Sequence, residues 1–147
     1  MSTASPEIPF NEALAKGFMG PTKGAGGGLP DYLGFELIDA APGTMTGRMV
    51  VREELLTPFG NMHGGVLSAF CDHMLGCVCY PAMKKGQWAA TTEFKINLTA
   101  PVSGGTLEAR AKIINLTRSQ AVVRIDVQNE GRICAVAQGT VTIRDPR

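Results

Sequence analysis

Asp72 is the residue whose type and position point most directly to chemistry. It lies between Cys71 and Met74 in a segment, 64–80, whose apolar side chains cover almost every angle of a helix, and this predicts a buried helix. An unpaired carboxylate in an apolar interior is costly, so an acid at such a position has either a partner or a function. The alternatives are that Asp72 pairs with a buried arginine or hydroxyl group, or that water reaches this face of the helix.

A second candidate group opens the same helix, at His63-Gly64-Gly65. Glycine is a poor helix former, so two glycines at a helix start suggest that another group approaches the backbone closely. The first amides of a helix have no internal acceptor and lie at its positive end. The amide of Gly64 is therefore suited to hold a carbonyl oxygen that gains negative charge, as an oxyanion hole does. The alternative is a tight turn that needs a positive φ, with His63 as a polar N-terminal cap.

The spacing of these two groups predicts an assembly. Eight residues of helix separate Gly64 from Asp72 by about 12 Å, so one reacting carbonyl cannot contact both within a subunit. A two-fold axis near Ser68, with two such helices packed antiparallel, would bring each Asp72 opposite the other subunit's Gly64. Ser68 and Ala69 are small enough to permit that approach. The chemistry thus predicts a homodimer with two composite sites, and a dimer of dimers is compatible with it.

Strands on both sides of the helix must position these groups. Two period-two segments precede it and four follow it, and the expected strands are 33–40, 44–52, 88–99, 106–117, 120–129 and 132–144. The turns between successive segments are too short for parallel crossovers, so the sheet is expected to be antiparallel. The predicted class is α+β, with the order β, β, α, β, β, β, β. We expect one domain over 31–147, preceded by a flexible N-terminal segment, 1–30, that contains a mobile glycine-rich loop at 20–28 and one short amphipathic turn at 10–18.

Composition excludes several classes of protein. The chain has 147 residues with 14 Lys and Arg against 13 Asp and Glu, a net charge of +1, and its scattered basic residues argue against a nucleic-acid partner. Charged residues are only 18%, which suggests that another subunit covers part of the surface. No apolar run approaches the roughly 18 residues of a transmembrane helix, and the first residues do not read as a secretory signal. A cytoplasmic location without membrane attachment is expected.

The four cysteines are predicted to be small apolar core residues of a protein in a reducing compartment. None of Cys71, Cys77, Cys79 and Cys134 forms a Cys-x-x-Cys pair, and the chain has only two histidines, so the spacing of a zinc site is absent. We therefore expect neither a metal nor a redox cofactor.

The segment Gly60-Asn61-Met62-His63-Gly64-Gly65-Val66-Leu67, followed by Asp72, resembles the hotdog-fold acyl-CoA thioesterases. The similarity extends to 91–94, to Ala100-Pro101 and to Gly104, and covers about residues 33–144. The closest group is the phenylacetate-pathway and 4-hydroxybenzoyl-CoA thioesterases. The resemblance implies a hotdog fold, in which a long antiparallel sheet wraps around one central helix. It also implies hydrolysis of an acyl-CoA to a free acid and coenzyme A, without a cofactor.

The resemblance also implies roles for individual residues. Asp72 would be the nucleophile or the general base, and the Gly64 amide, with His63 beside it, would polarise the thioester carbonyl from the other subunit. Thr91, on the strand after the helix, would orient water or the carboxylate. One departure is Thr57, which stands where many relatives carry Asn or Gln that helps to hold the thioester or water.

The remaining assignments concern substrate binding. Asn61 could compensate for the short Thr57 side chain, and Gly65 belongs to the same binding segment. The phosphates of coenzyme A are assigned to Arg118 and Ser119 at the tip of a hairpin, with Lys84, Lys85 and Arg144 as alternatives. Residues that could line an acyl pocket, or could equally be core, are Phe59, Met62, Leu67 and Met74. His73 is expected to be structural because it points about 100° away from Asp72 around the helix.

Two other functions remain open on the same fold, since fold does not determine function. One is a non-catalytic acyl-CoA-binding module, for which the acid Asp72 would be unnecessary. The other is an enoyl-CoA hydratase, which would use His63 and Asp72 to move a proton and water across a double bond. The His-Gly-Gly helix start resembles the thioesterase pattern more closely.

Overall fold

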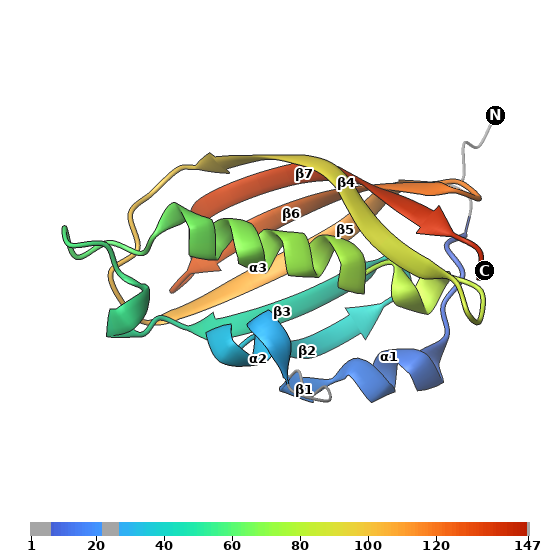
Figure 1. Cartoon of the computed structure of the whole chain (residues 1–147), viewed down its shortest axis with the longest axis horizontal. Helices are drawn as coiled ribbons and strands as arrows, with labels where there is room; N and C mark the ends of the chain where they lie inside the picture. Colours follow the sequence, from blue (N-terminus) through green and yellow to red (C-terminus); the bar gives the residue numbers. More distant parts are fainter. Residues whose placement is uncertain (1–6, 22–26, 147) are drawn as a thin grey trace.

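A seven-stranded antiparallel sheet curves around one long helix (Figure 1). The computed structural model describes residues 7–21 and 27–146. The strands follow the order β1-β2-β3-β5-β6-β7-β4. They comprise β1 (Gly20–Pro21), β2 (Glu36–Ala41), β3 (Thr44–Val50), β4 (Trp88–Leu98), β5 (Thr106–Leu116), β6 (Gln120–Asn129) and β7 (Arg132–Arg144). The central helix is α3 (Gly64–Cys77). The predicted hotdog fold is confirmed.

Helix α3 lies in the concave side of the sheet and carries the centre of the core. Its fully buried side chains include Phe70, Cys71, Met74 and Leu75, and the ring of Phe70 packs against that of Phe35 with 4.8 Å between centroids. The α-helix ends at Cys77, three residues before the predicted end. The short 3₁₀ helix η2 (Tyr80–Ala82) continues the chain, because the proline within it is compatible only with the start of a new turn.

The period-two alternation of apolar and polar residues that the sequence predicts appears as alternating burial in β5, β6 and β7. Buried and exposed or half-buried residues alternate along β5 and β6, and the buried ones face α3. The connection between β6 and β7 consists of Glu130 and Gly131, both with positive φ, 48° and 82°. Two such residues form a turn whose twist matches that of the flanking strands, so β6 and β7 pair directly.

The N-terminal part contains more regular structure than its composition suggested. The amphipathic turn expected at 10–18 is the helix α1 (Glu12–Phe18), capped by Asn11, whose side-chain oxygen accepts the Leu14 amide at 3.0 Å. A further helix, α2 (Gly28–Leu33), ends at Gly34, whose φ is 75°. The strand expected from residue 33 therefore starts only at Glu36. The mobile loop predicted at 20–28 lies largely outside the described residues, so its mobility stays a prediction.

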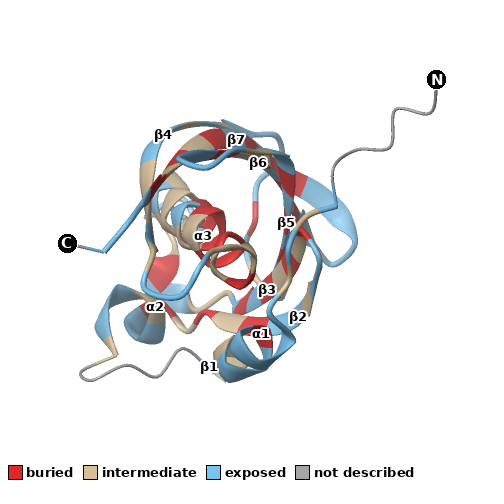
Figure 2. Ribbon diagram, turned by 90° about the vertical axis from the view of Figure 1, so that its right-hand side faces the viewer, coloured by how far each residue is buried: buried red, intermediate tan, exposed pale blue. Residues whose placement is uncertain are grey.

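Strand β4 forms one edge of the sheet, where it pairs only with β7 among the described strands. It crosses over α3 (Figure 1) and contacts it, and its far end places Leu98 against the helix start. Figure 2 shows the buried residues of α3 turned towards the sheet and its less buried residues on the side between β4 and α2. The central helix is thus covered on one side and open on the other.

All four cysteines are free and buried, as predicted for core thiols. Burial raises the pKa of Cys71, Cys77 and Cys79 to about 12 each, and it also raises that of Cys134. No helix of the described residues is long and apolar enough to cross a membrane.

Candidate active site

The open face of α3 is a stripe of small residues with one acid in it. Gly65, Ala69, Asp72 and Gly76 recur along the helix at a spacing of three and four residues, and none of them is buried. The expectation that Asp72 is buried is therefore wrong for the single chain. The sheet covers only one side of α3, and the small residues that count as apolar in the sequence line the uncovered side.

The carboxylate of Asp72 is available for chemistry in the protomer. It is exposed, and within residues 7–21 and 27–146 no hydrogen bond or ion pair reaches it. The alternative in which Asp72 pairs with a buried arginine or hydroxyl group of its own chain is thus not observed. The neighbouring His73 points into the fold, packs against the ring of Phe35 with 5.3 Å between centroids, and lies 3.5 Å from the thiol of Cys77. Burial lowers the pKa of His73, which suits the structural role expected for it.

The start of α3 has the polar cap that the alternative interpretation of His63-Gly64-Gly65 expected. His63 is the N-cap, and its Nδ1 accepts the amide of Gly65 at 2.9 Å. Neither Gly64 nor Gly65 has a positive φ, so the explanation by a strained turn does not hold. A Cβ on Gly64 would lie 2.8 Å from the Cδ1 atom of Leu98, and one on Gly65 would lie 2.9 Å from the His63 ring. A side chain at either glycine would therefore require Leu98 or the His63 ring to move.

One amide at this helix start remains available to a ligand. The Gly65 amide is used by His63, and the Val66 amide donates to the His63 carbonyl at 2.9 Å. No hydrogen bond of the described chain engages the amide of Gly64, which lies at the positive end of the helix. A donor of this kind is suited to stabilise an oxyanion. Along α3 it lies about 12 Å from Asp72, too far for one carbonyl to contact both.

Thr91 lies on the face of β4 that is turned towards α3. It pairs with Val141, which is fully buried, and a bulge follows between Thr91 and Glu93. The bulge leaves Thr92 on the outer face, where its hydroxyl group hydrogen-bonds that of Thr142. The half-buried Thr91 hydroxyl therefore faces the layer that holds the helix, while the hydroxyl next to it in sequence does not.

Thr57 and Asn61 belong to the connection that leads into α3. The amide of Thr57 donates to the Asn61 carbonyl at 2.6 Å, and that of Gly60 donates to the Thr57 carbonyl at 2.9 Å. The Thr57 hydroxyl oxygen accepts the amide of Phe59 at 3.3 Å, so it is partly engaged in its own turn. The Asn61 side chain is exposed and makes no hydrogen bond among the described residues. Of the two, Asn61 is the freer group for a substrate.

Arg118 and Ser119 form the turn between β5 and β6, away from the start of α3. Arg118 is 89% exposed, and its guanidinium lies 3.8 Å from the carboxylate of Asp145. The carbonyl of Ser119 accepts the amide of Ile143 at 2.8 Å, which anchors the turn to β7.

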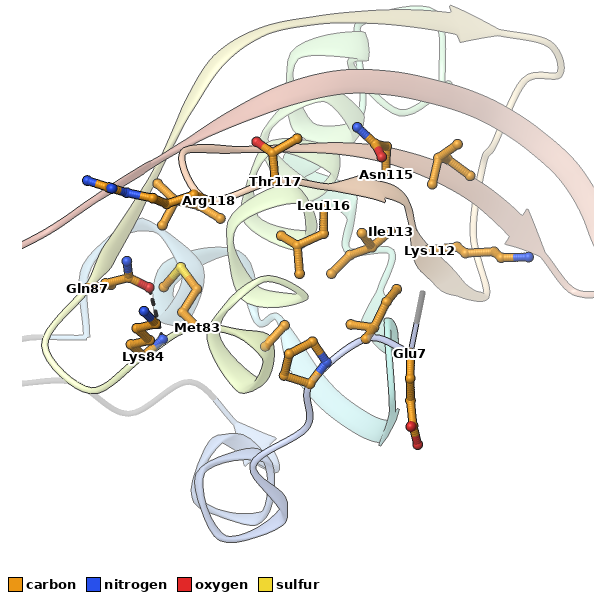
Figure 3. Close-up of a pocket in the computed structure, with 15 residues that line it drawn as sticks. Glu7, Met83, Lys84, Gln87, Lys112, Ile113, Asn115, Leu116, Thr117 and Arg118 are labelled. Carbon is orange, nitrogen blue, oxygen red and sulfur yellow. Dashed lines mark hydrogen bonds between the residues drawn. The ribbon is translucent and has the colours of Figure 1, made fainter. Parts of the chain in front are cut away.

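A cleft of about 820 Å³ opens beside this turn (Figure 3). Its apolar floor includes Ile113, Leu116 and Met83, and Arg118 and Lys112 lie at opposite edges. Lys84 also lines the cleft, whereas the other two cations suggested by the sequence, Lys85 and Arg144, do not. Lys112 was missed by sequence reasoning. The only sequence feature that could have indicated Lys112 is its position among the outward-facing residues of the alternating strand β5.

Comparison with known proteins places these features in context. The model of the thioesterase superfamily matches residues 59–136, more than half of the chain. A thioesterase structure from Haemophilus influenzae is 28% identical with a TM-score of 0.73 and covers 77% of this chain and 80% of its own. A 1,4-dihydroxy-2-naphthoyl-CoA hydrolase of Listeria monocytogenes is 23% identical over 82% of this chain and 98% of its own. The fold also resembles the E. coli PaaI protein from the phenylacetic acid degradation operon, with a TM-score of 0.72, 23% identity and coverage of 78% and 83%.

Proposed function

Because the chain belongs to the thioesterase superfamily, we propose that it hydrolyses an acyl-CoA thioester to a free acid and coenzyme A. The observation that carries this proposal is the exposed Asp72 carboxylate on the open face of α3, on the same helix whose first amide, that of Gly64, has no partner within the described chain. An acid and an oxyanion donor are the two groups that acyl transfer requires. A module that only binds acyl-CoA would not need the acid.

Two routes use these groups. In the first, Asp72 takes a proton from a water molecule whose oxygen attacks the thioester carbon, the C–S bond breaks, and the proton passes to the departing thiolate. In the second, a carboxylate oxygen of Asp72 attacks that carbon and coenzyme A leaves as the thiolate. Water then cleaves the mixed anhydride, which gives the free acid and restores the carboxylate, and the proton that this releases passes to the thiolate. In both routes the Gly64 amide donates to the carbonyl oxygen as it becomes negative.

The proposed site is shared between two subunits. Small residues along the open face of α3 allow a second copy of the helix to approach closely, and a two-fold axis near Ser68 would place each Asp72 opposite Gly64 of the partner subunit. The free edge of β4 supports the same assembly, because unpaired strand edges readily pair with another chain. Trp88 and Leu98, at the two ends of that edge, are 44% and 54% exposed. A homodimer would cover both.

We assign the phosphates of coenzyme A to the turn between β5 and β6. Arg118 would contribute a guanidinium, Ser119 a hydroxyl group, and Lys84 and Lys112 further positive charge around the neighbouring cleft. The pairing of Arg118 with Asp145 is exposed and long, at 3.8 Å, so an anionic ligand can displace it at little cost.

A panel of acyl-CoAs tests the function directly. Release of free thiol and loss of enoyl absorbance are followed in parallel, with aromatic, short branched and medium-chain acyl groups and a 2,3-enoyl group in the panel. The proposal expects thiol release from at least one saturated or aromatic acyl-CoA. Loss of enoyl absorbance without thiol release would identify a hydratase, and tight binding without any turnover would identify a binding module.

The Thr91 hydroxyl is expected to assist the reaction without performing it. We predict that Thr91→Ala lowers kcat by about tenfold, less than the loss of a general base or nucleophile, because the variant removes only an orienting hydrogen bond. Thr92→Ala is the matched control: it removes a hydroxyl group from the outer face of the same strand and should leave kcat within about twofold. Equal effects of the two variants would assign Thr91 to the stability of the strand.

Hydrolysis is expected to proceed without an added metal. The proposed chemistry uses only a carboxylate, an amide and water, and among the described residues no three His, Cys, Asp or Glu side chains are grouped so that they could hold a metal ion. We predict unchanged kcat after exhaustive dialysis against a chelator. A loss of activity that zinc or magnesium restores would contradict the mechanism.

A further inference from the structure

Phe59 is an aromatic side chain held in solvent at the entrance to α3. Its exposed fraction is 90%, the largest among the exposed large hydrophobic residues of the described chain. Three of the four side chains considered from the sequence as walls of an acyl pocket, Met62, Leu67 and Met74, are buried in the protomer's own core. Phe59 is the member of that group which a ligand can contact.

The ring is presented by an ordered connection. Leu56 and Met62 form a β-bridge at its base, and Thr57 donates its amide to the carbonyl of Asn61 inside it. Met62 is buried, which anchors the base in the core. The connection projects beyond the N-terminal end of α3, at the left of Figure 1. An apolar ring held outward in this way carries a hydration cost that a binding partner would remove.

The shared site determines where this ring would lie. If the two-fold axis passes near Ser68, Asp72 faces Gly64 of the partner subunit. The connection 57–61 comes directly before that glycine in the chain, so the partner's connection extends past Asp72 towards the C-terminal end of α3. Phe59 of the partner subunit then lies beyond the reacting thioester, where only a long acyl group would reach it, in a site whose acid comes from the other chain.

We propose that the partner subunit's Phe59 forms a wall of the acyl pocket and selects acyl groups with a long apolar body over short ones. This inference rests on the proposed thioesterase function and its dimer. A short acyl group ends before it reaches such a wall, whereas each further methylene buried against the ring improves binding. Discrimination by an apolar wall of this kind is typically 10- to 200-fold.

Phe59→Ala tests the selection. In the wild-type enzyme, kcat/KM should rise from the shortest acyl-CoA hydrolysed to octanoyl-CoA, and in the variant that rise should shrink by about tenfold, mainly through KM. Val50→Ala is the matched control, because it removes a 61% exposed apolar side chain from β3 and should leave the ratio unchanged. Light scattering should show the same assembly for both variants. An unchanged ratio in Phe59→Ala, or dissociation of its dimer, would overturn the assignment of Phe59 while leaving the thioesterase function intact. A wild-type enzyme that hydrolyses no acyl-CoA would overturn both.

A mixed dimer tests whether Phe59 acts across the subunit boundary. One chain carries Phe59→Ala and the other carries Asp72→Asn, and two different affinity tags isolate the mixed species. Its one working site combines the intact Asp72 of the first chain with the intact Phe59 of the second, so the wild-type chain-length ratio is expected. The ratio of the Phe59→Ala homodimer would show instead that the ring acts within its own chain, and would contradict the proposal.

Discussion

Asp72→Asn is expected to lower thioester turnover by about 10²-fold or more, the scale of losing a general base or nucleophile. The amide keeps the shape of the carboxylate but can neither take a proton from water nor attack a carbonyl carbon. The variant should fold, because the Asp72 side chain makes no hydrogen bond or ion pair with the described residues of its own chain. It should also bind acyl-CoA, which equilibrium binding can measure without interference from turnover.

A matched control separates chemistry from charge. Asp126→Asn removes a carboxylate from the outer face of β6, where it accepts hydrogen bonds from Arg124, and should leave kcat within about twofold. Normal hydrolysis by Asp72→Asn would show that the mechanism is wrong. Failure of this variant to fold, judged by its thermal transition beside that of Asp126→Asn, would make Asp72 a structural residue.

Ser68→Arg is expected to abolish assembly and to remove most of the activity. Ser68 is half-buried on the open side of α3, and its hydroxyl donates to the Gly64 carbonyl at 2.9 Å. An arginine there would hold two helices apart and separate each Asp72 from the partner's Gly64. Light scattering should show a monomer, and turnover should fall by about 10²-fold or more, as for loss of an oxyanion donor.

Two control variants show whether the effect of Ser68→Arg comes from the size of the new side chain at this position. Ser68→Ala keeps the side chain small and should retain the dimer and most of the activity, although it loses the hydrogen bond to Gly64. Gln128→Arg adds the same cation to the outer face of the sheet, far from α3, and should retain both as well. An active monomer of Ser68→Arg would rule out the shared site.

The strands after α3 and the helix start could be predicted because their signals are local. Alternation of period two marks β5, β6 and β7, and the glycines after His63 mark the first turn of α3. The helix α2 could not be predicted in this way. Its last carbonyls are held by Arg52, whose guanidinium donates to Tyr32 at 2.8 Å and to Leu33 at 3.2 Å from twenty residues away. A contact between residues so far apart in the chain produces no periodic pattern in the sequence around α2.

The exposure of Asp72 is a second feature that could not be predicted from the sequence. Small residues such as Ala69 and Gly76 count as apolar in a helical pattern, whether they face a core or a second helix. Which side of α3 is covered depends on the order of strands, and β4 follows the helix in sequence yet pairs with the last strand, β7. The direction of Thr91 likewise depends on the bulge beside it, which only the pairing register reveals. These features are properties of the assembled sheet.

Labelling of the buried thiols can measure how often the folded core opens. Disulfide exchange requires the thiolate, and burial raises the pKa of Cys71 and Cys77 to about 12, so these thiols stay protonated at pH 8. Folded chains therefore add little background colour to a thiol-counting assay of released coenzyme A. The slow colour that does develop without substrate measures how often the core unfolds far enough to admit the reagent. A ligand that binds only the closed form should slow this labelling in proportion to its occupancy, which gives a dissociation constant without any turnover.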